Sequence, residues 1–101
     1  MAVDSYENLV TYMTDNFDAT SGQMFGKRCI KINGKAGVAL FKEYLVFKLP
    51  KEKLEEALSL EGSNLWDPSG KGRVMKEWVQ IPIIHRAKFE AYAKSAAEYV
   101  R

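Results

Sequence analysis

Hydrophobic residues recur at helical spacing in the first part of the chain. Between Asp4 and Phe17 they follow one another at intervals of three and four residues. This spacing predicts an amphipathic helix over residues 4–17. Asp4 is the predicted N-cap, because Glu7 follows three positions later as in a capping box. The predicted apolar stripe comprises Tyr6, Leu9, Val10, Met13 and Phe17.

The pattern then changes from helical spacing to short segments separated by turn residues. Residues 18–22 are polar or small, and we interpret them as a turn. Residues 28–33 alternate and end in Asn33-Gly34, the pair that a type I′ hairpin turn favours, because both central residues need positive φ. Residues 36–41 form the predicted return strand. Lys42-Glu43 predicts a second tight turn before a third strand over residues 44–49.

A second helix and a further strand are predicted after Pro50. Pro50 suits the first position of a helix that ends near Gly62. Residues 66–72 are rich in turn-forming residues and predict a polar loop. Residues 73–81 read as a strand whose alternation slips. Val74 and Trp78 would share one face of this strand, and the other face would carry Met75, Val79 and Ile81. A bulge near Lys76-Glu77 would explain both sets.

Pro82 ends this strand, and a final helix is predicted over residues 84–100. Its apolar stripe comprises Phe89, Tyr92, Ala93, Ala96, Tyr99 and Val100. The order is helix, three strands, helix, one or two strands, helix. Because tight turns join successive strands, the sheet must be antiparallel, with helices mainly on one face. The predicted fold class is therefore a two-layer α+β domain, with residues 1–101 forming a single domain.

Composition adds a soluble character and removes several classes of site. The chain is 47% hydrophobic and 28% charged, with a net charge of +2. No apolar run reaches the ~18 residues of a membrane span, and the N-terminus lacks the basic and apolar regions of a secretory signal. Cys29 is the only cysteine, and no Cys/His cluster offers a metal site. We expect a cytoplasmic protein with no metal and no cofactor.

Two sets of short motifs resemble the N-terminal domain of the TfoX family. The first is Met24-Phe25-Gly26 with Asn33-Gly34-Lys35 and Leu45–Lys48, and the second is Trp66–Lys71 with Trp78–Pro82. The likeness runs from about Thr20 to the last helix. Where the family commonly has Arg-Met-Phe-Gly-Gly, this chain has Gln23-Met24-Phe25-Gly26-Lys27. The family-motif residues are Met24, Phe25, Gly26, Gly34, Trp78 and Pro82.

The resemblance implies an α-β-β-β-α-β-β-α order like that of type III secretion chaperones. It also implies a link to transcription regulation and natural competence, since TfoX proteins act as positive regulators of DNA-uptake genes. These are expectations from the likeness alone.

The residues offer little for catalysis. His85 is the only histidine, and we interpret it as a half-buried side chain bonded to backbone near Pro82. Cys29 alternates with Ile30 and Ile32, so it lies on the other face of its strand, and no adjacent base is evident. We therefore predict no catalytic residue. A small-molecule enzyme would need a deep pocket lined by His85 and acidic groups.

Two anion-binding hypotheses use the basic residues. Gly70-Lys71-Gly72-Arg73 could approach a phosphate, although it precedes a strand rather than a helix, and an ordinary solvated turn is the favoured interpretation. A basic hairpin could bind nucleic acid weakly, with Trp66 or Trp78 as stacking surfaces. The candidate contacts are Lys27, Arg28, Lys31, Lys35, Lys71, Arg73 and Lys76.

Protein association is the leading hypothesis. A domain of this length buries about 65% of its unfolded surface. One face of the sheet would remain open, and a second copy of the chain or another protein would cover it. The candidate exposed positions are Tyr12, Tyr44, Val46 and Trp78. The alternative is that these side chains pack locally against a neighbouring element. We expect a non-enzymatic interaction or regulatory module, with self-association as a homodimer.

Overall fold

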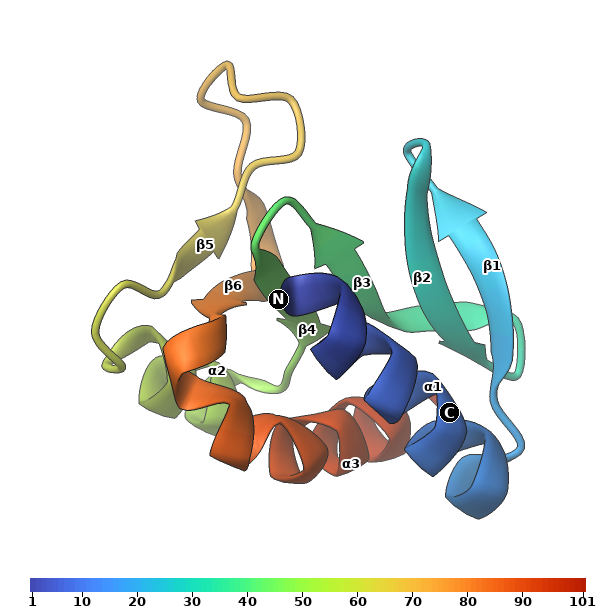
Figure 1. Cartoon of the computed structure of the whole chain (residues 1–101). Helices are drawn as coiled ribbons and strands as arrows, with labels where there is room; N and C mark the ends of the chain where they lie inside the picture. Colours follow the sequence, from blue (N-terminus) through green and yellow to red (C-terminus); the bar gives the residue numbers. More distant parts are fainter.

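A curved antiparallel sheet carries the helices on one of its faces in the computed structural model, which describes residues 1–101 (Figure 1). The predicted α+β fold with an antiparallel sheet is confirmed. One strand more than the predicted order is present. The elements are α1 (Ala2–Phe17), β1 (Thr20–Met24), β2 (Lys27–Ile32), β3 (Lys35–Phe41), β4 (Tyr44–Lys48), α2 (Lys51–Leu58), β5 (Asn64–Trp66), β6 (Met75–Pro82), the 3₁₀ helix η1 (Ile83–Lys88) and α3 (Phe89–Val100).

The strands lie in the order β1-β2-β3-β4-β6-β5, and every neighbouring pair is antiparallel. Asn33 and Gly34 have φ of 53° and 79°, which confirms the predicted type I′ geometry between β2 and β3. Lys42, with φ of 53°, opens the predicted tight turn between β3 and β4. The two edges of the sheet are β1 and β5.

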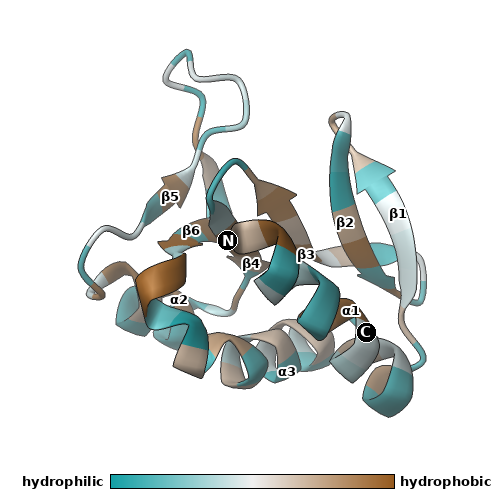
Figure 2. Cartoon of the chain, in the orientation of Figure 1, coloured by the Kyte–Doolittle hydropathy of each residue, from teal (hydrophilic) through white to brown (hydrophobic).

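The additional strand is β1, where the sequence predicted a turn. Thr20 pairs with Lys31 and Met24 with Lys27, and Phe25 and Gly26 form the turn with φ of 55° and 74°. The prediction was wrong because β1 has no alternation of apolar side chains to identify it. Its strand conformation comes from hydrogen bonds to β2. Figure 2 shows the contrast: β3 is brown along most of its length, whereas β1 is pale or teal.

The predicted bulge in β6 is confirmed. Leu65 pairs with Val79, but its neighbour Trp66 pairs with Met75, so three residues of β6 have no opposite residue on β5. The bulge turns Met75 to the same face as Trp78, whereas Val79 and Ile81 face the helices. The expectation that Met75 shares the face of Val79 was therefore wrong.

Three helix boundaries differ from the predictions. The first helix starts at Ala2, so Asp4 lies in its first turn and Met1 is the N-cap residue. Burial of Ala2 explains the longer helix, since its side chain is fully enclosed by the core. Pro50 precedes α2 as its N-cap residue, and Gly62, with φ of 84°, lies in the turn beyond it.

The predicted final helix is divided in two. Residues Ile83–Lys88 form η1, with a kink at His85, and α3 begins at Phe89. None of the side chains of η1 is buried, so packing does not hold this segment in the regular α conformation. The predicted stripe of α3 is buried except for Tyr99, which is 42% exposed.

The helix-side core lies between the sheet and the helices. Phe47 on β4 packs against Phe89 and Tyr92 of α3, with ring centroids 5.6 and 6.0 Å away. Burial of these aromatic and aliphatic groups is the main stabilising contribution to the fold. No helix combines the length and the apolar character that crossing a bilayer requires. From the sheet, this core includes Ile30, Ile32, Val38, Leu45, Phe47, Val79 and Ile81.

Candidate functional site

The sheet face away from the helices has a small core of its own, which we call the far-face cluster. Trp66 is fully buried there, and its ring lies 5.3 Å from Trp78 and 5.9 Å from Phe41. Phe25, in the turn between β1 and β2, lies edge-on to Trp66 at 6.3 Å. Because β1 and β5 are opposite edges, this contact shows how strongly the sheet curves. The cluster comprises Cys29, Ala39, Phe41, Val46, Trp66 and Trp78.

This closure corrects the expected exposure of the far face. Val46 and Trp78, predicted to be exposed, are only 0% and 5% exposed because the curved sheet encloses them. Tyr44 is half-buried against the same cluster. Tyr12 lies on the other side of the molecule, half-buried and edge-on to Phe17 at 5.9 Å. None of the four is a freely exposed apolar side chain.

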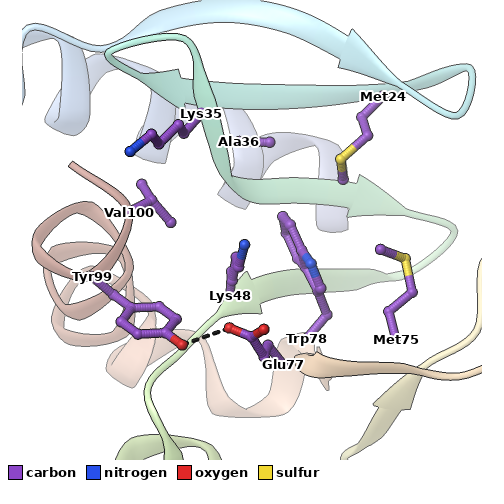
Figure 3. Close-up of a pocket in the computed structure, with 9 residues that line it drawn as sticks. All are labelled: Met24, Lys35, Ala36, Lys48, Met75, Glu77, Trp78, Tyr99 and Val100. Carbon is purple, nitrogen blue, oxygen red and sulfur yellow. Dashed lines mark hydrogen bonds between the residues drawn. The ribbon is translucent and has the colours of Figure 1, made fainter.

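What remains open on this side is a groove of about 640 Å³, which we call the far-face groove. Figure 3 shows Met24 and Met75 on one side of it, Lys35, Tyr99 and Val100 on the other, and Trp78 between Lys48 and Met75. Strands β1, β3, β4 and β6 and the last turn of α3 contribute to its walls. The lining residues are Met24, Lys35, Ala36, Lys48, Met75, Glu77, Trp78, Tyr99 and Val100.

The charges of the groove are unequal. Tyr99 donates a hydrogen bond from its hydroxyl to Oε1 of Glu77 at 2.5 Å, and this bond raises the pKa of Tyr99 above its usual value. Neither Lys35 nor Lys48 belongs to an ion pair, since the three pairs of the molecule join other groups. The groove therefore presents two ammonium groups and one carboxylate that already accepts a hydrogen bond.

The basic residues of the first hairpin do not form one patch. Arg28 faces the helices, where it pairs with Glu7 and lies 4.8 Å from the ring of Tyr6. Lys27 faces the other way, 5.4 Å from the ring of Phe41. Lys31, like Lys27, is on the far face, where it covers Gly22, and Lys35 reaches the groove. Alternation along the strand separates these side chains.

The glycine-rich loop is organised by its own carboxylate. Asp67 accepts hydrogen bonds from the backbone N–H groups of Ser69, Gly70 and Gly72 at 3.1, 3.0 and 2.7 Å. A hydrogen bond from the Ser69 hydroxyl and these backbone donors lower the pKa of Asp67. The donors that a phosphate would use are thus engaged, which favours the solvated-turn interpretation. Three basic candidates are exposed here, at Lys71, Arg73 and Lys76.

Neither of the two nucleophile or base candidates lines the groove. His85 is half-buried, and its Nε2 donates to the carbonyl of Glu61 at 2.8 Å, a backbone bond as predicted but to a different segment. Cys29 is fully buried, and burial raises the pKa of its thiol. No group of three His, Cys, Asp or Glu side chains is placed to hold a metal ion.

Sequence reasoning missed three residues of this region and misplaced a fourth. Lys48 had a signal, because it continues the alternation of Tyr44 and Val46 onto the far face. Lys42 also had a sequence signal, because it is the only cation of its turn. Its ammonium group lies 5.2 Å from the centroid of the Phe41 ring. Trp66 was placed in a loop, and Tyr99 in the buried stripe. Only the tertiary packing locates these two. The expectation that Trp66 or Trp78 offers a stacking surface was wrong, because both rings are buried in the far-face cluster.

The family-motif residues lie at several places in the fold. Met24 and Trp78 line the groove, Phe25 lies edge-on to Trp66, and Gly26 and Gly34 form turns. Pro82 pairs with Tyr44, and a Cβ at Gly62 would lie 3.0 Å from its ring. Comparison of the chain with protein-family models, with curated proteins and with solved structures found no match. The TfoX likeness therefore rests on these sequence motifs alone.

Proposed function

We propose that this chain is a non-enzymatic interaction module of the TfoX N-terminal type that forms a homodimer by pairing strand β1 with its counterpart in a second copy. The observation that carries the proposal is the free edge of β1. An edge strand presents unpaired N–H and C=O groups, which form a template for another strand. In Figure 1, β1 lies at the outer edge of the sheet with no element beside it.

The chemistry of β1 does not protect this edge. Natural edges carry charges, proline or bulges that discourage pairing. β1 has the sequence Thr-Ser-Gly-Gln-Met, with no charged residue and no proline, and its pairing with β2 is regular over five residues. The opposite edge, β5, is only three residues long and is followed by the β6 irregularity. β1 is therefore the better edge for adding a strand.

A two-fold axis through Gly22 would make the pairing self-complementary. Antiparallel strands related by such an axis place Thr20 of one copy opposite Met24 of the other, and Ser21 opposite Gln23. Ser21 and Gln23 are exposed and point to the helix side, together with their β2 partners Ile30 and Arg28. The pairing would extend the sheet of one copy continuously into the other.

The non-enzymatic part of the proposal rests on the separation of the reactive groups. His85 is held by the Glu61 carbonyl on the helix side, whereas Cys29 is enclosed in the far-face cluster. A nucleophile needs a base within hydrogen-bond reach and access to substrate. The far-face groove is lined by other residues, and it contains neither of these side chains.

The test is a change of charge on β1. Ser21→Lys with Gln23→Lys places like charges opposite one another in the proposed pairing, so the dimer should dissociate. Asn8→Lys with Thr11→Lys adds the same charge at exposed positions of α1 and is the matched control. Light scattering after gel filtration should give a dimer mass for the wild type and the control, and a monomer mass for the β1 variant.

Circular dichroism should be the same for all three proteins. A wild-type monomer at high protein concentration would refute the dimer. A β1 variant that keeps the dimer mass would refute the strand-pairing geometry.

The regulatory part of the proposal comes from the TfoX resemblance. TfoX proteins promote expression of DNA-uptake genes, and we infer a related role for this chain. Transcript levels of such genes should fall when the chain is deleted from its own cells and recover when it is restored. Unchanged transcripts under competence-inducing conditions would remove this part of the proposal and leave the dimer untouched.

A second candidate function is weak binding of single-stranded nucleic acid, at the end of the sheet that carries Phe41. The ammonium groups of Lys27 and Lys42 lie 5.4 and 5.2 Å from the Phe41 ring, and Phe25 nearby is 62% exposed. Phe41 itself is buried, so the exposed ring of Phe25 would be the stacking surface, with the two lysines beside the phosphates.

Lys27→Glu with Lys42→Glu should remove this binding, whereas Lys51→Glu with Lys94→Glu, the same charge change on the helices, should retain most of it. The logarithm of the wild-type affinity should fall with the logarithm of salt by ~0.7 per phosphate contact. If both double variants weaken binding equally, the binding is non-specific electrostatic attraction, and this candidate function would be rejected.

A further inference from the structure

We propose that the far-face groove binds an amphiphilic carboxylate, a small molecule with one anionic head and an apolar body. This goes beyond strand pairing, because β1 pairs through its backbone edge whereas the groove lies over the far face of the sheet. The two are physically separate except for Met24, whose side chain points from β1 into the groove (Figure 3).

The apolar half of the groove is suited to an aliphatic or aromatic body. Met24 and Met75 lie on the same side of it, Ala36 leaves room on β3, and Trp78 lies beside Met75. Methionine side chains are flexible and polarizable, so they adapt to ligands of irregular shape. Trp78 is 5% exposed and packs on Trp66 at 5.3 Å, which keeps this surface in one position.

The other half decides the charge of the ligand. Lys35 and Lys48 carry the only cationic groups of the lining, and neither has an acidic partner within ion-pair distance. Glu77 is the only carboxylate, and the Tyr99 hydroxyl donates to it at 2.5 Å. Two unpaired ammonium groups against one hydrogen-bonded carboxylate favour an anion over a cation.

The size of the groove favours a small molecule. Its volume of about 640 Å³ lies within the roughly 300–1,000 Å³ that is usual for small-molecule sites, which are mostly apolar with a few placed polar groups. Lysine acts as a point charge rather than a planar fork, so the head is selected mainly by its charge. A carboxylate with a medium-length hydrocarbon chain satisfies both halves of the groove.

The probe is decanoate, followed through the methyl signals of the methionines by NMR. Met24 and Met75 line the groove, whereas Met13 is buried on the helix side and Met1 is at the exposed N-terminus. Decanoate should shift the signals of Met24 and Met75 saturably and leave those of Met13 and Met1 unchanged. Decanol has the same body without the charge, and acetate has the head without the body. Both should bind at least about tenfold more weakly, the factor that 1.4 kcal/mol represents.

Lys48→Met keeps most of the side-chain stem and removes the charge. It should weaken decanoate binding by about fivefold to tenfold and leave decanol binding unchanged. Lys94→Met removes an exposed charge of α3 outside the groove and is the matched control, with binding expected as in the wild type. Neither variant should alter the dimer mass, so this proposal and strand pairing fail independently.

Four results would overturn the proposal. In the first, decanol binds as tightly as decanoate. In the second, Lys48→Met retains full decanoate affinity. In the third, decanoate shifts the methyl signal of Met13 as much as that of Met24, which would indicate unfolding by a detergent-like anion. Saturable binding of an acidic peptide, with no response to decanoate, would also overturn it, because the groove would then serve a macromolecular partner.

Discussion

The closure of the sheet around Trp66 leads to a quantitative prediction about stability. Trp66 is fully buried and contacts Trp78, Phe41 and Phe25, whereas Phe25, at the other end of the same contact, is 62% exposed. Replacement of a buried tryptophan by alanine costs about 3–5 kcal/mol, through lost burial and the cavity that remains. The loss of stability in Trp66→Ala should be close to the lower of these two values. The indole N–H of Trp66 is buried without a hydrogen-bond partner, so the substitution also removes that unfavourable contribution.

Phe25→Ala removes an exposed ring and one edge-on aromatic contact, and should cost about 0.5–1.5 kcal/mol. The assay is urea denaturation of both variants and the wild type. A protein of this size unfolds with a slope of about 1–3 kcal/mol per molar urea, so Trp66→Ala should lower the midpoint by roughly 1–3 M. The total stability is about 5–15 kcal/mol, which leaves the variant folded without denaturant.

The difference in stability between the two variants tests whether the far face is a packed core. Both alter the same contact between opposite edges of the sheet, but only one opens a cavity in the far-face cluster. If Trp66→Ala costs no more than Phe25→Ala, the far face is not a packed core, and the groove described above has no rigid floor.

Three further predictions concern individual residues. Burial raises the pKa of Tyr6 from 10.0 to about 12, so the unfolded chain loses this proton first and stability should fall as pH rises from 10 towards 12. Tyr6→Phe should reduce that fall in urea titrations, and a pH profile identical to that of the wild type would contradict the prediction. Gly34→Ala, at φ of 79°, should cost about 1–2 kcal/mol because a Cβ is strained there although no neighbour is within 4 Å, and an unchanged urea midpoint would refute the turn geometry. The amide NMR signals of Gly70 and Gly72 should titrate together at a pH below the ordinary Asp pKa of 3.8, and Asp67→Ala should abolish this titration. A midpoint at or above that pKa would show that the backbone N–H groups of the loop are not bonded to Asp67.

The two proposed surfaces use different properties of one sheet. β1 offers backbone hydrogen-bonding groups with no charged side chain beside them, whereas the groove offers side chains of opposite character at its two ends. Strand addition would place a second copy along β1, next to Met24. A ligand in the groove would then lie close to the dimer interface. Dimer mass measured with and without decanoate would show whether the two events are coupled.

Local patterns predicted much of the fold. Asn33-Gly34 defined a turn because few residue pairs tolerate two positive φ angles, and the broken alternation of residues 73–81 predicted the bulge. The candidate site was predicted less well. Among the basic residues of the first hairpin, Arg28 was grouped with Lys27 although the strand places them on opposite faces.

The sequence by itself determined the α+β class, the antiparallel hairpins and most residues of the helix-side core, because turn chemistry and apolar periodicity act over a few residues. Only the tertiary structure decided that residues 20–24 form a strand, since its hydrogen bonds come from β2. It also decided that the far face closes. Sheet curvature sums small twists over six strands, and it brings Phe25 to Trp66 across 41 positions of sequence, a contact that no local pattern encodes.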